Sequence, residues 1–222
     1  MYFQFLIEDK SGEIILEEIM KKYISSIPNN YHIDYKIHGF KRIGRIPKLE
    51  KVSLVKTKRL LNDLLMYLKG MDASLNKMPY KKAVFVIIDA DDNNCVNLKQ
   101  NLVNMYEKLD IKTEVFFCIA IEEIEAWLLG DKEALLKAYP SAKKNILQRY
   151  IQDSICGTWE ILADVVYRGG VNKLKKDANS YYEIGKFKCE CAKNIAKELN
   201  INKNLSESFK YFMKKLNFLV FK

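Results

Sequence analysis

Apolar residues in the first 121 positions gather in short runs that have the length and composition of β-strands. The runs are rich in aromatic and β-branched residues, and they cover residues 2–7, 31–40, 81–88 and 113–121. The run at 31–40 alternates apolar with charged residues, which is typical of an edge strand. The other three are nearly continuous and indicate strands buried on both faces.

Longer stretches with helical spacing of apolar residues separate these runs. They predict helices at residues 11–26, 51–68 and 94–109. The alternation of strand and helix predicts an α/β fold, with a mostly parallel sheet flanked by helices.

After Glu122 the strand signals fade, and the spacing predicts helices at 122–131, 158–167, 186–199 and 206–218. Pro140 marks a boundary, and Gly169 with Gly170 predicts a break between helices. We therefore expect an α/β domain over residues 1–139 and a basic helical extension over residues 140–222.

Acidic residues follow three of the predicted strands. Glu8 follows the first strand, Asp89 and Asp91 follow the third, and Glu123 and Glu125 follow the fourth. The carboxyl ends of parallel strands meet at one edge of a sheet, which is where such sheets bind ligands. Converging carboxylates without basic residues nearby in the sequence repel each other unless a cation lies between them. Mg²⁺ prefers oxygen ligands, so this pattern predicts a metal site.

Each of these acids also has a simpler interpretation. Asp and Glu are common at the start of helices, where a carboxylate caps backbone N–H groups and the helix dipole favours negative charge. Glu123 and Glu125 precede or begin a predicted helix, so a capping role remains open for both.

The chain carries a net charge of +9, which points towards polyanionic partners. Residues 140–222 hold 16 basic and 8 acidic side chains, so most of the excess lies in the predicted extension. A second concentration lies at residues 36–59, which hold nine basic side chains and one acidic one. Within it, Lys41, Arg42 and Arg45 are candidates for phosphate contacts; a solvated surface is the alternative for both regions.

Five cysteines are present, and the apolar runs are far too short for a bilayer span. An odd number of cysteines without a signal peptide predicts reduced thiols, so we expect a soluble protein in the cytoplasm. Cys189 and Cys191 do not have the spacing of a zinc site.

The placement of Glu8 after a first strand, and of Asp89-Ala-Asp91 after a later one, resembles the TOPRIM fold of topoisomerases, primases and overcoming-lysogenization-defect (OLD) nucleases. The whole chain resembles an uncharacterised bacterial family with a TOPRIM-like core. The matching segments are Glu8-Asp-Lys-Ser-Gly-Glu13, Ile88-Asp-Ala-Asp-Asp92, Ala120-Ile-Glu-Glu-Ile-Glu-Ala-Trp-Leu-Leu-Gly-Asp131, Cys156-Gly-Thr-Trp-Glu-Ile-Leu-Ala-Asp164 and Asn204-Leu-Ser-Glu-Ser-Phe209. Many TOPRIM motifs have Gly after the Glu, whereas this chain has Asp9.

The resemblance implies roles for the acids. Glu8 would act in acid–base chemistry or metal binding, and Asp89 with Asp91 would hold Mg²⁺ or Mn²⁺. In OLD-type nucleases further acids permit a second metal, a role that would fall on Glu123 and Glu125. Related small TOPRIM proteins are often encoded beside an ATPase of the ABC or AAA type in phage-defence pairs, which implies an ATPase partner.

These observations favour a nuclease that uses Mg²⁺ or Mn²⁺ to hydrolyse phosphodiester bonds of DNA or RNA. The alternative is a non-catalytic regulatory or partner-binding subunit that keeps the fold. A third interpretation, a phosphoacceptor domain with Asp89 as the acceptor, is disfavoured by the two aspartates that follow it at positions 91 and 92.

Overall fold

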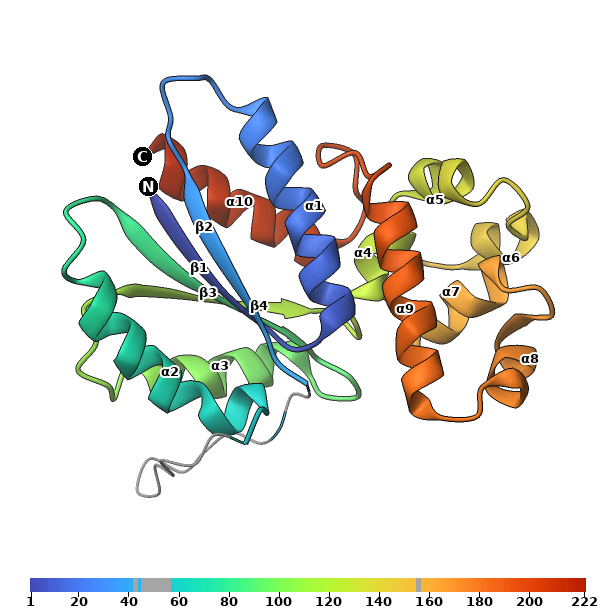
Figure 1. The fold of residues 1–222 in the computed structure, drawn as a ribbon, viewed down its shortest axis with the longest axis horizontal. Helices are drawn as coiled ribbons and strands as arrows, with labels where there is room; N and C mark the ends of the chain where they lie inside the picture. The colour runs from blue at the N-terminus through green and yellow to red at the C-terminus, as the bar shows by residue number, and fades with distance from the viewer. Residues whose placement is uncertain (42–43, 45–56, 155–156) are drawn as a thin grey trace.

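A four-stranded, all-parallel β-sheet forms the centre of the molecule (Figure 1). The computed structural model describes residues 1–41, 44, 57–154 and 157–222. The strands are β1 (Tyr2–Ile7), β2 (Asp34–Gly39), β3 (Lys82–Asp89) and β4 (Glu114–Ala120), in the spatial order β2-β1-β3-β4. This is the α/β fold with a parallel sheet that the strand–helix alternation predicts, and β2 lies at an edge as expected.

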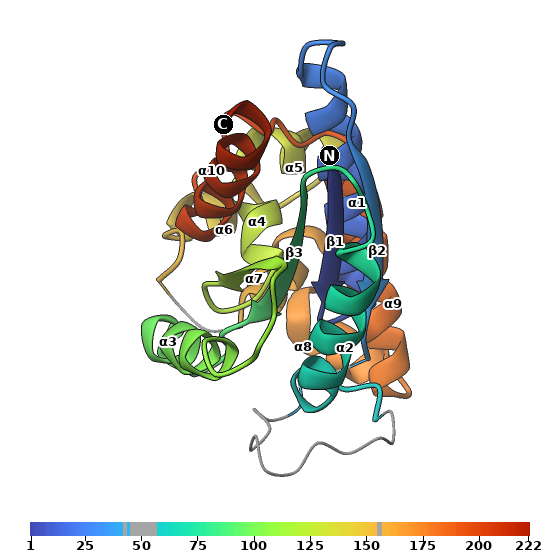
Figure 2. The same ribbon diagram turned by 90° about the vertical axis from the view of Figure 1, so that its left-hand side faces the viewer.

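Helices cover both faces of the sheet. Helix α1 (Lys10–Ser26) lies on one face, and α2 (Leu60–Leu75) and α3 (Cys95–Tyr106) lie on the other (Figure 2). Successive side chains of one strand enter different cores: Phe85 packs in the cluster that contains α1, and Val86 packs in the cluster that contains α2 and α3. Because both faces are covered, β1, β3 and β4 are apolar at nearly every position, unlike the edge strand β2.

The remaining helices extend the molecule to one side and then return to the sheet (Figure 1). They are α4 (Glu125–Leu129), α5 (Lys132–Ala138), α6 (Lys144–Arg149), α7 (Thr158–Val166), α8 (Gly170–Asp177), α9 (Tyr181–Ala196) and α10 (Glu207–Phe221). Helix α9 packs along α1, and α10 packs on the sheet. The ring centroid of Phe212 in α10 lies 6.2 Å from that of Phe5 and 5.7 Å from that of Phe85. The helical part therefore shares one apolar core with the sheet, and the division at residue 139 stays a prediction.

Two helix starts differ from the sequence prediction for local reasons. The helix expected at 51–68 begins at Leu60 in its described part, and residues 51–56 lie outside the described ranges. Lys58 has a φ of 61°, and the carboxylate of Asp63 accepts hydrogen bonds from the backbone N–H groups of Thr57 and Lys58. The helix expected at 122–131 is confined to Glu125–Leu129, because Glu122 has a φ of 65°.

Three short helices, α5, α6 and α8, lack the repeating apolar stripe that would have predicted them. Within the described ranges, no helix is both long enough and apolar enough to cross a membrane. The four cysteines in those ranges are free thiols.

Candidate functional site

The acidic ends of β1 and β3 lie next to each other. At this point the connections between strands switch from one face of the sheet to the other. From β1 the chain passes over one face to β2, and from β2 it returns over the other face to β3, which pairs with β1 on its opposite side. In doubly wound sheets the ligand crevice lies outside the carboxyl ends of the strands at such a point. Ile7 pairs with Ile87, so Glu8 and Asp89 leave neighbouring parallel strands at the same edge. The expected convergence of these two strand ends is confirmed.

Glu8 and Asp89 are in direct contact. The backbone N–H of Asp89 donates a 3.2 Å hydrogen bond to Oε2 of Glu8, and Oδ1 of Asp89 accepts a 3.0 Å bond from the N–H of Ile124. Burial raises the pKa of Glu8 to about 8; the bond from Asp89 lowers this value, and the charge of Asp91 raises it. Burial and the charge of Glu8 also raise the pKa of Asp89 well above its usual range. Both carboxyls therefore resist ionisation.

Asp91 lies in the turn beyond β3. Its φ of 47° is in the left-handed region, and its N–H donates a 2.8 Å bond to the carbonyl of Glu122. Asp91 is exposed, although desolvation by its surroundings raises its pKa, an effect opposed by the charge of Lys188. The turn thus holds an accessible carboxylate beside the buried pair.

Glu125 begins α4 and is fully buried. Its Oε1 accepts a 2.8 Å hydrogen bond from Oγ of Ser11, near the start of α1. Its Oε2 is buried and has no hydrogen-bond partner within the described part of the chain. Burial raises the pKa of Glu125 to about 7, against the attraction of Lys188. An orphaned buried oxygen of this kind is unusual in a folded protein and calls for an explanation.

The fold brings a basic partner to the acids that no pattern near them in the sequence indicates. Lys188 reaches from α9, with Nζ 3.2 Å from Oε1 of Glu125 and 3.8 Å from Oδ2 of Asp9. Burial by itself would lower the pKa of Lys188, but the charges of Glu125 and Asp9 raise it above its usual value. The acids lack basic partners nearby in the sequence, yet the fold brings one from 63 positions beyond Glu125.

Asp9 and Glu123 have capping roles. Asp9 caps α1, since its Oδ1 accepts a 2.8 Å bond from the N–H of Gly12. Glu123 binds the start of α7: its Oε2 accepts bonds from Oγ1 of Thr158 at 3.0 Å and from the N–H of Trp159 at 2.9 Å. Burial raises the pKa of Glu123, and Lys188 and these bonds oppose the shift. Glu123 therefore caps α7 and not the helix expected at 122–131, whereas Glu125 joins the acidic cluster. A metal-binding role for Glu123 stays a prediction.

The donor chemistry of this edge fits Mg²⁺ or Mn²⁺. Glu8, Asp89, Asp91 and Glu125 offer hard carboxylate oxygens, and the orphaned Oε2 of Glu125 lacks a donor. The described residues contain no set of three or more acidic, histidine or cysteine side chains already arranged around one point as metal ligands. A metal ion at this edge would therefore require side-chain rotation, with Lys188 as the cation already present.

The basic stretch at residues 36–59 includes the end of β2, which lies at the same edge of the sheet. Lys41 follows the end of β2, is exposed, and donates its N–H to the carbonyl of Lys58 at 3.1 Å. Arg42 and Arg45 lie outside the described residues. The predicted phosphate contacts of these three side chains stay predictions.

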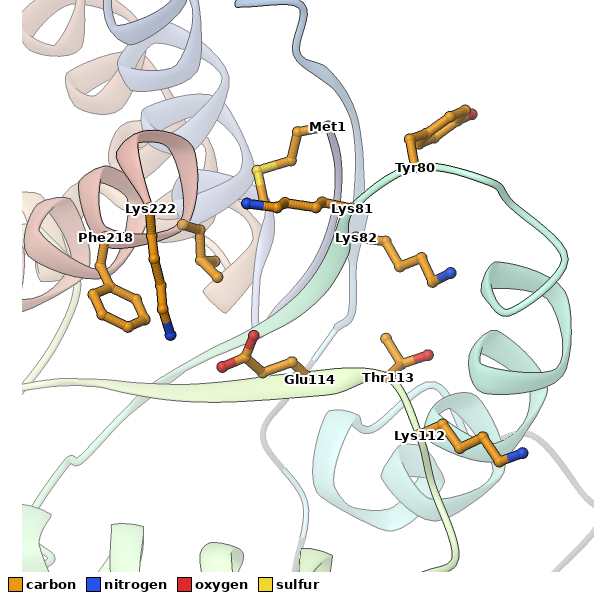
Figure 3. Close-up of a pocket in the computed structure, with 10 residues that line it drawn as sticks. Met1, Tyr80, Lys81, Lys82, Lys112, Thr113, Glu114, Phe218 and Lys222 are labelled. Atoms are coloured by element: carbon orange, nitrogen blue, oxygen red, sulfur yellow. The ribbon is translucent and has the colours of Figure 1, made fainter.

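A different pocket opens at the opposite, amino-terminal edge of the sheet (Figure 3). Its volume is about 470 Å³, and its lining residues include Lys81, Lys82 and Lys112 beside Glu114. The lysine chains point in different directions in Figure 3 and do not surround one point. This pocket contains none of the predicted site residues.

Residues 7–217 match DUF4276, a domain of unknown function. The chain belongs to this family. Neither the curated proteins nor the solved structures contain a significant match to it. The DUF4276 match covers Glu8, Asp89, Glu125 and Lys188 together with the helical part, so family membership includes the whole candidate site.

Proposed function

We propose that this DUF4276 protein is a nuclease dependent on Mg²⁺ or Mn²⁺, with its active site at the carboxyl edge of β1 and β3. The proposal rests on the grouping of the half-buried Glu8 with the buried Asp89 and Glu125, with the pKa of each raised. Grouping buried carboxyls costs stability, and groups with strongly shifted pKa values cluster at functional sites.

Each residue has a role that follows from its position. Asp89 and the exposed Asp91 would hold the ion, with Glu8 and Glu125 completing the oxygen ligands. When bound, the ion would supply positive charge opposite the scissile phosphate and favour ionisation of a water. Glu8, with a pKa of about 8, can accept or return a proton near neutral pH. Lys41 and the lysines of the helical part would contact the nucleic-acid backbone.

An ATPase partner and a place in cytoplasmic anti-phage defence belong to the same proposal, and the resemblance to TOPRIM and OLD proteins supports them. On this account, the isolated protein cleaves slowly and the partner raises its rate.

One observation favours the non-catalytic alternative. Lys188 already neutralises part of the cluster, and a buried ion pair with Glu125 can serve a structural purpose without any metal. Under that alternative, the protein binds a partner through the same fold and needs no divalent cation.

Cleavage assays separate the two functions. Purified wild-type protein and Asp89→Asn are incubated with labelled DNA and RNA at high Mn²⁺ concentration, so that slow turnover becomes measurable. The Asn amide oxygen retains the acceptor for the N–H of Ile124, so the fold should persist. We expect cleavage to fall by about 10²–10³-fold in the variant, the usual cost of losing one electrostatic group in an active site. Equal rates in the two proteins would contradict the nuclease proposal.

A further inference from the structure

A groove of about 720 Å³ lies in the helical part, between α7, α8 and the start of α9. Its lining combines aromatic, polar and basic side chains, among them Trp159, Lys175, Ser180, Tyr181 and Ile184. Figure 1 shows how the chain passes from α8 into the beginning of α9. None of these residues belongs to the acidic cluster.

Two tyrosines at the start of α9, of which Tyr181 lines the groove, are unusually exposed. Tyr181 is 91% exposed and Tyr182 is 72% exposed, the two highest values among the exposed large apolar and aromatic side chains that the structure describes. The ring of Trp159 is half-buried at the groove wall. Solvent-facing rings of this kind do not stabilise the core, but they offer flat surfaces on which a nucleic-acid base can stack.

Positive charge accompanies the rings. Nζ of Lys175 lies 5.1 Å from the ring centroid of Trp159, and Nζ of Lys186 lies 4.8 Å from that of Tyr182. Within the groove Lys175 forms a 3.4 Å ion pair with Glu160, so the net positive charge comes from the surrounding helical part, which carries a net charge of +8. Aromatic rings interleaved with lysines form the usual surface for single-stranded nucleic acid.

The groove shares two structural elements, α7 and α9, with the surroundings of the candidate active site. Trp159 donates its backbone N–H to Glu123, which begins the segment that leads to Glu125. Tyr181, Ile184 and Lys188 are spaced i, i+3 and i+7 on α9, so they share one stripe of the helix. Seven residues of helix span about 10 Å. A single nucleic-acid strand that lay along this stripe would extend from Tyr181 to the acidic cluster within a few nucleotides.

We infer that this groove binds unpaired bases of the nucleic-acid substrate, and that the protein acts on single-stranded or locally unpaired DNA or RNA. The inference rests on the proposed function and adds its substrate class. Trp159 and Tyr181 stack on bases, and Lys175 lies near the phosphates. A duplex presents its bases only at its ends and cannot use these surfaces.

Intrinsic fluorescence gives a direct readout, because the chain has two tryptophans and they differ in exposure. Trp127 is fully buried against Phe209 and Phe212, whereas Trp159 lines the groove. The full-length protein in EDTA is titrated with a short oligothymidylate and with a duplex of equal length. We expect the single strand to quench Trp159 and to bind more tightly than the duplex.

Substitutions at position 181 test the stacking directly. Tyr181→Ala should weaken oligothymidylate binding by roughly 5- to 150-fold, the range reported for loss of one base–aromatic stack. Tyr181→Phe keeps the ring and should bind like wild type. Tyr80→Ala is the matched control, since Tyr80 is an exposed tyrosine at the opposite edge of the sheet.

The outcomes separate the groove from the nuclease proposal. Suppose that oligothymidylate quenches Trp159, that Tyr181→Ala abolishes the quenching, and that the protein does not cleave. This result would support base binding in the groove and contradict the nuclease proposal. Cleavage without quenching of Trp159, or with equal affinity for duplex and single strand, would contradict base binding in the groove. The nuclease proposal would be unaffected. Absence of oligothymidylate binding would also contradict base binding in the groove.

Discussion

At the carboxyl edge of the sheet Asp89 and Glu125 are buried, whereas at the amino edge Lys81 and Lys112 face solvent. The same strands end in charged residues at both edges, but α4 and α9 bury the acidic edge, whereas the end of α10 lines an open pocket at the amino edge. Solvated lysines cost little and need no partner, while buried carboxyls must be protonated, hydrogen-bonded or paired with a cation. Both edges carry charged residues, so what distinguishes the candidate site from the amino edge is that its charged side chains are buried.

The largest effect should come from removing the cation of the acidic edge. Lys188→Met leaves Glu125 and Asp9 without their ammonium partner, and breaking a buried pair costs roughly 3–5 kcal/mol. Lys81→Met at the amino edge should change stability by less than about 0.5 kcal/mol. Urea unfolding of both variants in EDTA measures the difference. Similar stabilities for the two would show that the acidic edge is no more strained than the surface.

A smaller effect should appear in the pH dependence of the protein's stability. The folded-state pKa values of Glu8 and Glu125, about 8 and about 7, lie above their ordinary value of 4.5. The folded protein therefore binds more protons than the unfolded chain across that window, so its stability should fall as the pH rises from about 5 to about 8. Glu8→Gln should flatten the profile, because the amide does not ionise. A stability that rises over the same window would mean that these carboxyls are charged in the folded protein.

The smallest of these effects concerns Glu123, which caps α7. Glu123→Ala removes the acceptor for Trp159 and should cost about 0.5–2 kcal/mol, the usual value of a cap. Glu123→Gln keeps one acceptor oxygen and should cost less. Mn²⁺ affinity should stay nearly unchanged in both variants. A loss of affinity as large as that of Asp89→Asn would instead make Glu123 a metal ligand.

Local patterns along the sequence predict the sheet and its acidic edge well. The uninterrupted apolar run before Asp89 indicates a strand covered on both faces, and parallel pairing then places Glu8 beside Asp89. Periodicity also identifies α1, α3, α7, α9 and α10.

The rest depends on contacts between distant parts of the chain. Lys188 is one of many lysines in a basic helical stretch, and nothing beside it in the sequence marks it as the partner of Glu125. Ser11 is likewise an ordinary helix-start residue until the fold places it against Glu125. The capping of α7 by Glu123 spans 36 positions, so spacing alone could not separate it from Glu125. The starts of α2 and α4 depend on positive φ angles at Lys58 and Glu122, residue types that seldom adopt them.

Calorimetric titration with Mn²⁺ measures directly whether the buried carboxyl edge binds a divalent cation. Wild-type protein, Asp89→Asn and Glu114→Gln are compared, because Glu114 is an exposed acid at the amino edge of the sheet. The account predicts that wild type and Glu114→Gln bind Mn²⁺ alike, while Asp89→Asn binds at least about tenfold more weakly. Equal affinity in all three proteins, or no Mn²⁺ binding by wild type, would contradict it.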